Sequence, residues 1–140
     1  VAGYCTENQN FYVLEDCTLR GAPVEWAKAA IDAYHRHSAN LLVYESNQGG
    51  EMVAQTLRIY DSVPMNPVWA SKNKQARAEP ISLLYEQGKA HHIGAFYKLE
   101  DELCMWEPGT GASPNRLDAL VWAITWLKDN TRPKARIAGR

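Results

Sequence analysis

The chain has 140 residues, 46% of them hydrophobic and 22% charged, which fits one soluble globular domain with its own core. No apolar run approaches the length needed to span a bilayer, and no signal-peptide pattern opens the sequence. Three cysteines form no C-x-x-C pair and leave an odd one, which argues against a disulfide framework. The formal net charge of −1 is locally uneven: residues 72–77 and 128–140 are basic and 99–107 are acidic.

The first half of the chain predicts strands that alternate with helices. Residues 11–19 are rich in aromatic and β-branched side chains and are expected to form a strand that pairs with 1–4. A helix is expected over 23–37, with a proline at its first position and apolar residues at helical spacing. Residues 41–45 begin with consecutive apolar side chains, which indicates a strand buried on both faces.

The second half continues this alternation and ends in the clearest helix. Its expected elements are helices over 51–60, 75–87 and 96–106, short strands at 68–70 and 92–93, and a last helix from Pro114 to Leu127 with Ser113 as N-cap. Tryptophans at 26, 69, 122 and 126 are expected in the core. The predicted fold class is α/β, with a mixed sheet flanked by helices over 1–127 and a flexible basic tail over 128–140.

Two carboxylates, Glu45 and Asp118, lie at positions that suit either a functional or a purely structural role. Glu45 closes the most apolar strand and precedes a polar, glycine-containing loop, and ligands bind at the carboxyl ends of strands in such sheets. It is equally well explained as the point where the strand emerges into solvent. Asp118 lies in the second turn of the last helix, at the edge of the apolar stripe. Spacing alone favours a structural role for it, as a carboxylate near a helix N-terminus.

Several segments, taken in order, resemble the C-terminal nuclease domain of bacteriophage large terminase subunits. They run from YVLEDCTLRGAPVEWAKAAIDAYHRH through VYESNQGGEMV, ASKNKQARAEPISLLYEQGKAHHIGAF and LEDELCMW to SPNRLDALVWAITWL, about residues 11 to 127. E-x-N-Q-G-G-[ED]-M-V and S-P-[ND]-R-x-D-A-L-V-W-A are distinctive as a pair. The resemblance implies a ribonuclease H-like fold of the integrase and resolvase type. It also implies a metal-dependent endonuclease that cuts double-stranded concatemeric DNA during genome packaging.

The same resemblance assigns Glu45 and Asp118 as catalytic metal ligands for Mg²⁺ or Mn²⁺, at a site that holds two ions in the intact protein. The family's remaining aspartate lies on the first strand of the sheet, for which this sequence has no counterpart. We therefore expect residues 1–127 to be a nuclease domain truncated before Val1, lacking its first strand and inactive alone, because two carboxylates do not hold a pair of ions.

For DNA contacts we expect Lys72, Lys74 and Arg77, whose alternative role is a solvated helix entry. Asn47 and Asn115 are possible supports of the site, although Asn115 is also explained by helix capping. The expected partners are double-stranded DNA, an upstream ATPase domain of the same polypeptide, the portal and the small terminase subunit, in the cytoplasm of the bacterial host and without a membrane. Two alternatives stay open: a non-catalytic DNA-binding or docking module on the same fold, and a resolvase-type nuclease.

Overall fold

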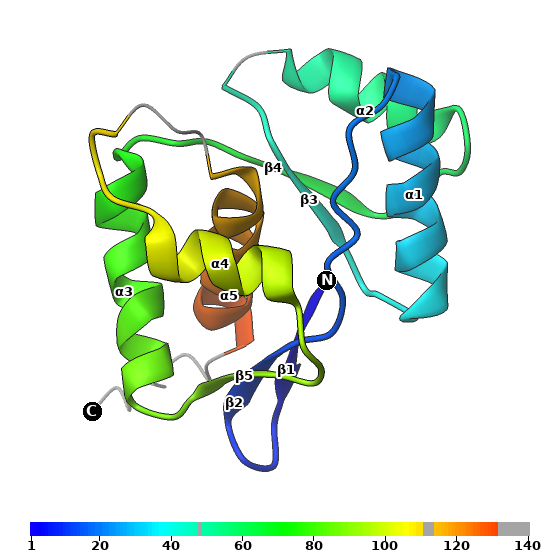
Figure 1. The fold of residues 1–140 in the computed structure, drawn as a ribbon. Coiled ribbons are helices and arrows are strands. Elements are labelled where there is room, and N and C mark those ends of the chain that lie inside the picture. The colour runs from blue at the N-terminus through cyan, green and yellow to red at the C-terminus, as the bar shows by residue number, and fades with distance from the viewer. Residues whose placement is uncertain (48, 111–113, 132–140) are drawn as a thin grey trace, which may run out of the picture.

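The computed structural model of the protein describes residues 1–47, 49–110 and 114–131. Strands and helices alternate along most of the chain, as the sequence predicts (Figure 1). The strands are β1 (Ala2–Cys5), β2 (Asn10–Val13), β3 (Leu42–Glu45), β4 (Met65–Val68) and β5 (Ala90–His92). The helices are α1 (Pro23–Arg36), α2 (Gly50–Arg58), α3 (Lys74–Glu86), α4 (Tyr97–Met105) and α5 (Asn115–Thr131).

The strands form two small sheets. In the first, β2 lies between β1, to which it is antiparallel, and β5, to which it is parallel. In the second, β3 and β4 are parallel, with Leu42 opposite Met65 and Glu45 opposite Val68. Within the described residues, β1 and β3 are each hydrogen-bonded to one neighbouring strand. The predicted α/β class and the hairpin between 1–4 and the following strand are confirmed.

The strand predicted over 11–19 is too long. β2 ends at Val13; beyond it the Leu14 amide donates to the Val1 carbonyl at 2.8 Å, and the Val1 amino group donates to the Glu15 carbonyl at 2.7 Å. The chain then leaves the sheet because the Glu15 carboxylate accepts hydrogen bonds from Arg36 and His37 at the end of α1, each 2.6 Å long. These two bonds hold the pKa of Glu15 below its usual value.

The second sheet also differs from the prediction. β3 is only half-buried and Glu45 is exposed, so this strand is not covered on both faces. β4 occupies 65–68 rather than 68–70, because its position is set by pairing with β3. Its Pro67 cannot donate to a ladder, which suits a strand with a single neighbour.

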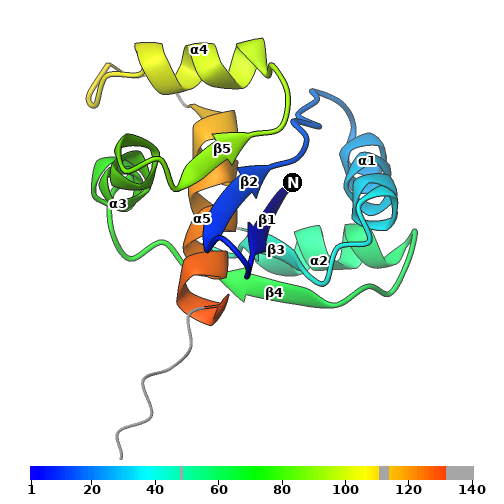
Figure 2. The ribbon, with the colours of Figure 1, turned by 90° about the horizontal axis from the view of Figure 1, so that it is seen from below.

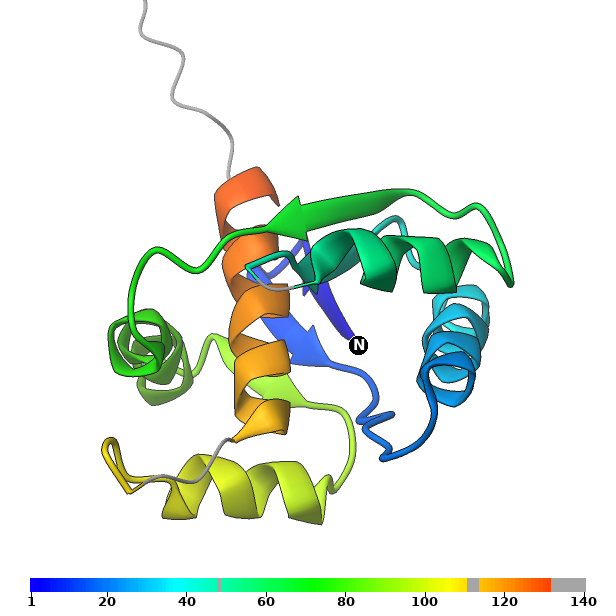
Figure 3. The same cartoon turned by 90° about the horizontal axis from the view of Figure 1, so that it is seen from above.

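The buried side chains form two clusters. The larger lies around the first sheet, α3, α4 and α5, and includes the predicted stripe Leu117, Leu120, Val121 and Ile124. The smaller lies around α1 and α2 and consists of Ala27, Ile31, Leu57 and Val63. Seen from above and below, α5 lies between α3 on one side and α1 and α2 on the other (Figures 2 and 3). This helix therefore joins the two parts of the fold.

The last helix continues farther than predicted, to Thr131, so residues 128–131 of the expected tail are helical. Its predicted N-cap, Ser113, and residues 132–140 lie outside the described residues. The first turn of α5 is capped from another helix, because Glu102 of α4 accepts the amide protons of Arg116 and Leu117 at 2.9 and 3.2 Å. None of the helices in the described ranges is long and apolar enough to cross a membrane.

Candidate carboxylate site

β3 and α5 bring the two carboxylates singled out in the sequence to one place. Glu45 is the last residue of β3, and its Oε2 accepts a hydrogen bond of 3.2 Å from the indole Nε1 of Trp122. Trp122 follows Asp118 by one helical turn on α5, and side chains four residues apart share a face of a helix. The two carboxylates therefore lie on the same side of the fold, and Trp122 links the end of β3 to the face of α5 that carries Asp118.

Asp118 is ion-paired to the first turn of α3. Lys74 Nζ lies 2.8 Å from Asp118 Oδ2, and Arg77 Nη2 lies 3.2 Å from Asp118 Oδ1. The Arg77 guanidinium also lies 4.8 Å from the centre of the Trp122 ring, a favourable distance for a cation–π contact. Lys74 and Arg77 were predicted to contact DNA, and in this structure both contact Asp118. Lys72 is exposed in the segment that leads to α3.

The hydrogen bonds in this cluster are incomplete. Asp118 Oδ1 and the Arg77 Nε and Nη1 atoms are buried and make no hydrogen bond. An unsatisfied buried polar atom is costly, and such atoms often mark a place that another group fills. The oxygen of Asp118 can thus take a further ligand.

The Asn47 side chain binds the backbone of the segment after β4, and not the carboxylates. Its Nδ2 donates to the Ala70 carbonyl at 2.9 Å, and its Oδ1 accepts from the Ala70 amide at 2.6 Å. Ser46 adds a hydroxyl bond to the Val68 carbonyl, so the loop after β3 is fixed to the segment after β4. These bonds hold the end of β3, and thereby the backbone of Glu45, in place. Asn115, the other proposed support, is exposed at the start of α5.

The glycines after Glu45 are required by the turn that begins α2. Gly49 has a φ of 69°, a left-handed conformation that favours glycine. A Cβ on Gly50 would lie 2.7 Å from the Ser46 Cβ, too close for any other residue without a shift of the chain. The G-G pair of the motif is thus explained by the turn that follows the carboxylate.

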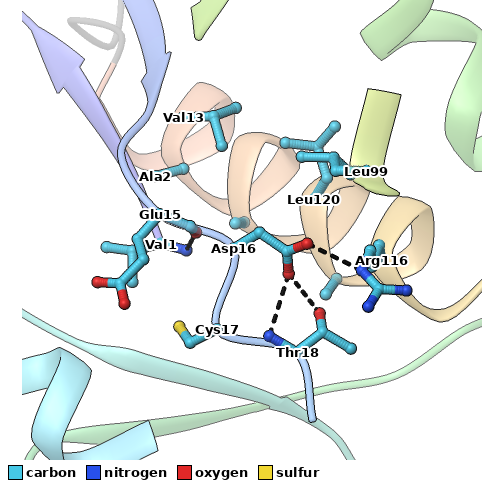
Figure 4. Close-up of a pocket in the computed structure, with 12 residues that line it drawn as sticks. Val1, Ala2, Val13, Glu15, Asp16, Cys17, Thr18, Leu99, Arg116 and Leu120 are labelled. Carbon is cyan, nitrogen blue, oxygen red and sulfur yellow. Dashed lines mark hydrogen bonds and ion pairs between the residues drawn. The ribbon is translucent and has the colours of Figure 1, made fainter. Parts of the chain in front are cut away.

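Arg116 fixes the start of α5. Its Nε donates to Asp16 at 2.8 Å and its Nη1 to Glu102 at 3.0 Å, which ties the segment after β2 and helix α4 to α5. Figure 4 shows Asp16 between Arg116 and Thr18, beside a cavity of about 240 Å³. Burial opposes ionisation of Asp16, but the bonds from Thr18 and Arg116 outweigh it and lower its pKa. Since Asp118 follows two residues later, this ion-pair cluster sets its position.

A larger apolar cavity, of about 640 Å³, lies between α3, α4, α5 and β5. Three of its polar side chains are hydrogen-bonded in a row: the Tyr85 hydroxyl lies 2.8 Å from His92 Nε2, and His92 Nδ1 lies 3.0 Å from Glu100. Burial raises the pKa of Tyr85 to about 12, so the hydroxyl keeps its proton in this row of bonds. These hydrogen bonds link α3, β5 and α4, and their role is structural.

Trp122 is the participant that the sequence reasoning missed. It was expected in the core, yet it is half-buried and contacts both Glu45 and Arg77. Its spacing of four residues from Asp118 was the available signal. Trp69 was also expected in the core and is 64% exposed.

The donor set suits a hard divalent cation but is small. Carboxylate oxygens are the ligands that Mg²⁺ and Mn²⁺ prefer, and the orphaned oxygen of Asp118 fits that chemistry. Within the ranges that the structure describes, no three His, Cys, Asp or Glu side chains gather where they could hold an ion. Glu45 and Asp118 alone therefore fall short of a metal site within these ranges.

Comparison with known protein families gives a match to the terminase RNaseH-like domain, which covers residues 5–127. The chain belongs to this family. The match includes β3, α3 and α5 as far as Leu127, and so every residue of the carboxylate site. Membership establishes the ribonuclease H-like fold and supports a nuclease-type role in DNA packaging, which favours the terminase interpretation over the resolvase alternative. A search of curated proteins finds no match to the chain.

Proposed function

We propose that this terminase domain is a divalent-metal-dependent endonuclease that cuts double-stranded DNA during packaging, with Glu45 and Asp118 as metal ligands. One observation supports the proposal above all: Glu45, at the end of β3, accepts a hydrogen bond from Trp122, which follows Asp118 by one turn of α5. A bound Mg²⁺ or Mn²⁺ would supply Lewis-acid stabilisation of the phosphodiester and a water of lowered pKa.

The chain's own residues would orient the reactants. Trp122 holds the Glu45 carboxylate by its indole N–H, and Arg77 and Lys74 place positive charge beside Asp118. Lys72 is exposed nearby and is proposed to bind a DNA phosphate without reading sequence. Because the described residues supply only two carboxylates here, we propose that the 140-residue chain alone cuts DNA poorly and that a third carboxylate completes the site.

The test is cleavage of supercoiled plasmid by the longest natural polypeptide that contains this chain, at millimolar Mn²⁺. Glu45→Ala and Asp118→Ala should each slow cutting by about 100-fold, equivalent to ~3 kcal/mol of transition-state stabilisation. Glu51→Ala, which removes an exposed carboxylate from α2, is the matched control and should cut at the wild-type rate. Wild-type cutting by both site variants would show that these carboxylates are not the catalytic ligands.

One observation favours the alternative, a non-catalytic DNA-binding or docking module. Both oxygens of Asp118 face cations of α3, as expected of an ion pair that only joins two helices. On that interpretation Asp118→Ala would lower the melting temperature, and the unsubstituted polypeptide would bind duplex DNA without cutting it at any Mn²⁺ concentration.

A further inference from the structure

The two cations on Asp118 differ in how firmly they are held. The Lys74 side chain is 34% exposed, whereas that of Arg77 is 11% exposed. Arg77 also lies 4.8 Å from the centre of the Trp122 ring, a cation–π contact that holds its guanidinium. A lysine side chain is flexible and its ammonium binds as a point charge, while a stacked guanidinium is fixed by its planar shape. Lys74 is thus the exchangeable partner of Asp118, and Arg77 is the fixed one.

Lys74 competes with any metal ion for Asp118. An ammonium 2.8 Å from Oδ2 occupies one of the two carboxylate oxygens, and its charge repels a divalent cation that approaches either of them. Release of Lys74 would free Oδ2 beside the orphaned Oδ1 and remove the repelling charge, while the ion pair with Arg77 would keep the carboxylate in place.

A DNA phosphate is the ligand that can draw Lys74 away. Lys74 begins α3, two residues after the exposed Lys72, so a phosphate bound at Lys72 would lie within reach of its ammonium. Exchange of one carboxylate for one phosphate oxygen preserves an ion pair for Lys74, so it costs little.

We propose that Lys74 is a latch on Asp118 that DNA opens, so that DNA and the divalent ion bind with positive coupling. This inference rests on the proposed function, because it takes Asp118 as a metal ligand. The latch would keep the site from acquiring its ion until the substrate is present. By thermodynamic linkage, DNA must tighten ion binding by the same factor by which the ion tightens DNA binding.

The experiment is a Mn²⁺ titration followed by the electron paramagnetic resonance signal of the free ion. It uses the longest natural polypeptide that contains the chain, without nucleotide, with and without a nuclease-resistant phosphorothioate duplex. Ions bound elsewhere on the protein or by the duplex are subtracted with the Asp118→Ala variant. Duplex affinity is measured in parallel by fluorescence anisotropy, and its dependence on Mn²⁺ must give the same coupling factor.

For the unsubstituted protein, the duplex should lower the Mn²⁺ dissociation constant at least about fivefold. Lys74→Met should bind Mn²⁺ at least about threefold more tightly than wild type without DNA, because a competing charge is gone, and should lose most of the coupling. Lys74→Arg, which keeps the cation, should retain the coupling. Lys72→Met is the matched comparator: it removes an identical charge nearby, and should weaken duplex binding while leaving Mn²⁺ affinity without DNA unchanged.

Two failures are distinguishable. If Lys74→Met and Lys72→Met have the same Mn²⁺ affinity and the same coupling, Lys74 is not a latch, although Asp118 can still be a metal ligand. If Asp118→Ala binds Mn²⁺ as the unsubstituted protein does, the proposed metal site itself is wrong.

Discussion

Replacing Arg116 by methionine should destabilise the fold by about 2–4 kcal/mol. The side chain makes charged hydrogen bonds to Asp16 and Glu102, at 2.8 and 3.0 Å, and a bond to a charged group contributes about 1.5–3 kcal/mol when shielded from water. The three side chains are 16–24% exposed, so the loss should exceed that of a surface pair, ~1 kcal/mol, and fall below that of two fully buried pairs.

This free energy is measurable by urea unfolding followed by tryptophan fluorescence. For a chain of this size each 1 kcal/mol shifts the melting temperature by about 3–4 °C, so the variant should melt roughly 6–16 °C lower. Arg58→Met is the matched control, because Arg58 is exposed at the end of α2 and should change stability by less than about 0.5 kcal/mol. A loss below about 1 kcal/mol in Arg116→Met would refute the reasoning.

The same variant should change how stability depends on pH. The pKa of Asp16 is lower in the folded state, so its contribution is present above its unfolded pKa of about 3.9 and is lost as the pH falls through the folded pKa. Part of that shift comes from Arg116. The stability difference between wild type and Arg116→Met should therefore be constant above about pH 5 and shrink below about pH 4. A difference that grows in acid would contradict this sign.

Two further predictions concern DNA and the sheet. Reversing Lys72 and Lys74 to glutamate should weaken duplex binding equally for all sequences and reduce the slope of log K against log salt by roughly 2, about 0.9 per lost phosphate contact; an unchanged slope would leave these residues as a solvated face. Because β1 and β3 each have one neighbour within the described residues, adding the upstream segment of about 20 residues expected to carry the first strand and its aspartate should raise the melting temperature and give Mn²⁺-dependent cutting. An unchanged melting temperature together with no Mn²⁺-dependent cutting would argue against the nuclease interpretation.

The parts of the fold with local signals were predictable from the sequence. The buried stripe of α5 and the start of α1 follow from apolar spacing and a proline at the first position, which need no knowledge of the rest of the chain. β4 was placed too late, because Met65–Val68 has weak strand preference and is a strand through its pairing with β3. The end of β2 at Val13 depends equally on distant partners, since Glu15 turns toward α1.

The site was predictable in its carboxylates but not in their surroundings. Glu45 and Asp118 follow from the motifs, and the structure puts them on the same side of the fold. The ion pairs of Asp118 with α3 and the position of Trp122 arise from the packing of α3 and β3 against α5. Such contacts between distant segments leave no periodic trace in a sequence. Whether the carboxylates bind an ion stays a prediction.

Glu45 and Asp118 belong to parts of the molecule with separate cores. β3 and β4 pack against the smaller cluster through Leu42 and Met65, whereas the buried face of α5 belongs to the larger one. Regions with separate cores open as separate cooperative units, each with its own free energy. How often the hydrogen bond between Trp122 and Glu45 breaks is then governed by the unit of α1, α2, β3 and β4, and not by the global stability of the chain. A neighbouring domain or subunit that stabilises this smaller unit would raise the fraction of molecules in which Glu45 is held against α5, while α5 itself stays unchanged.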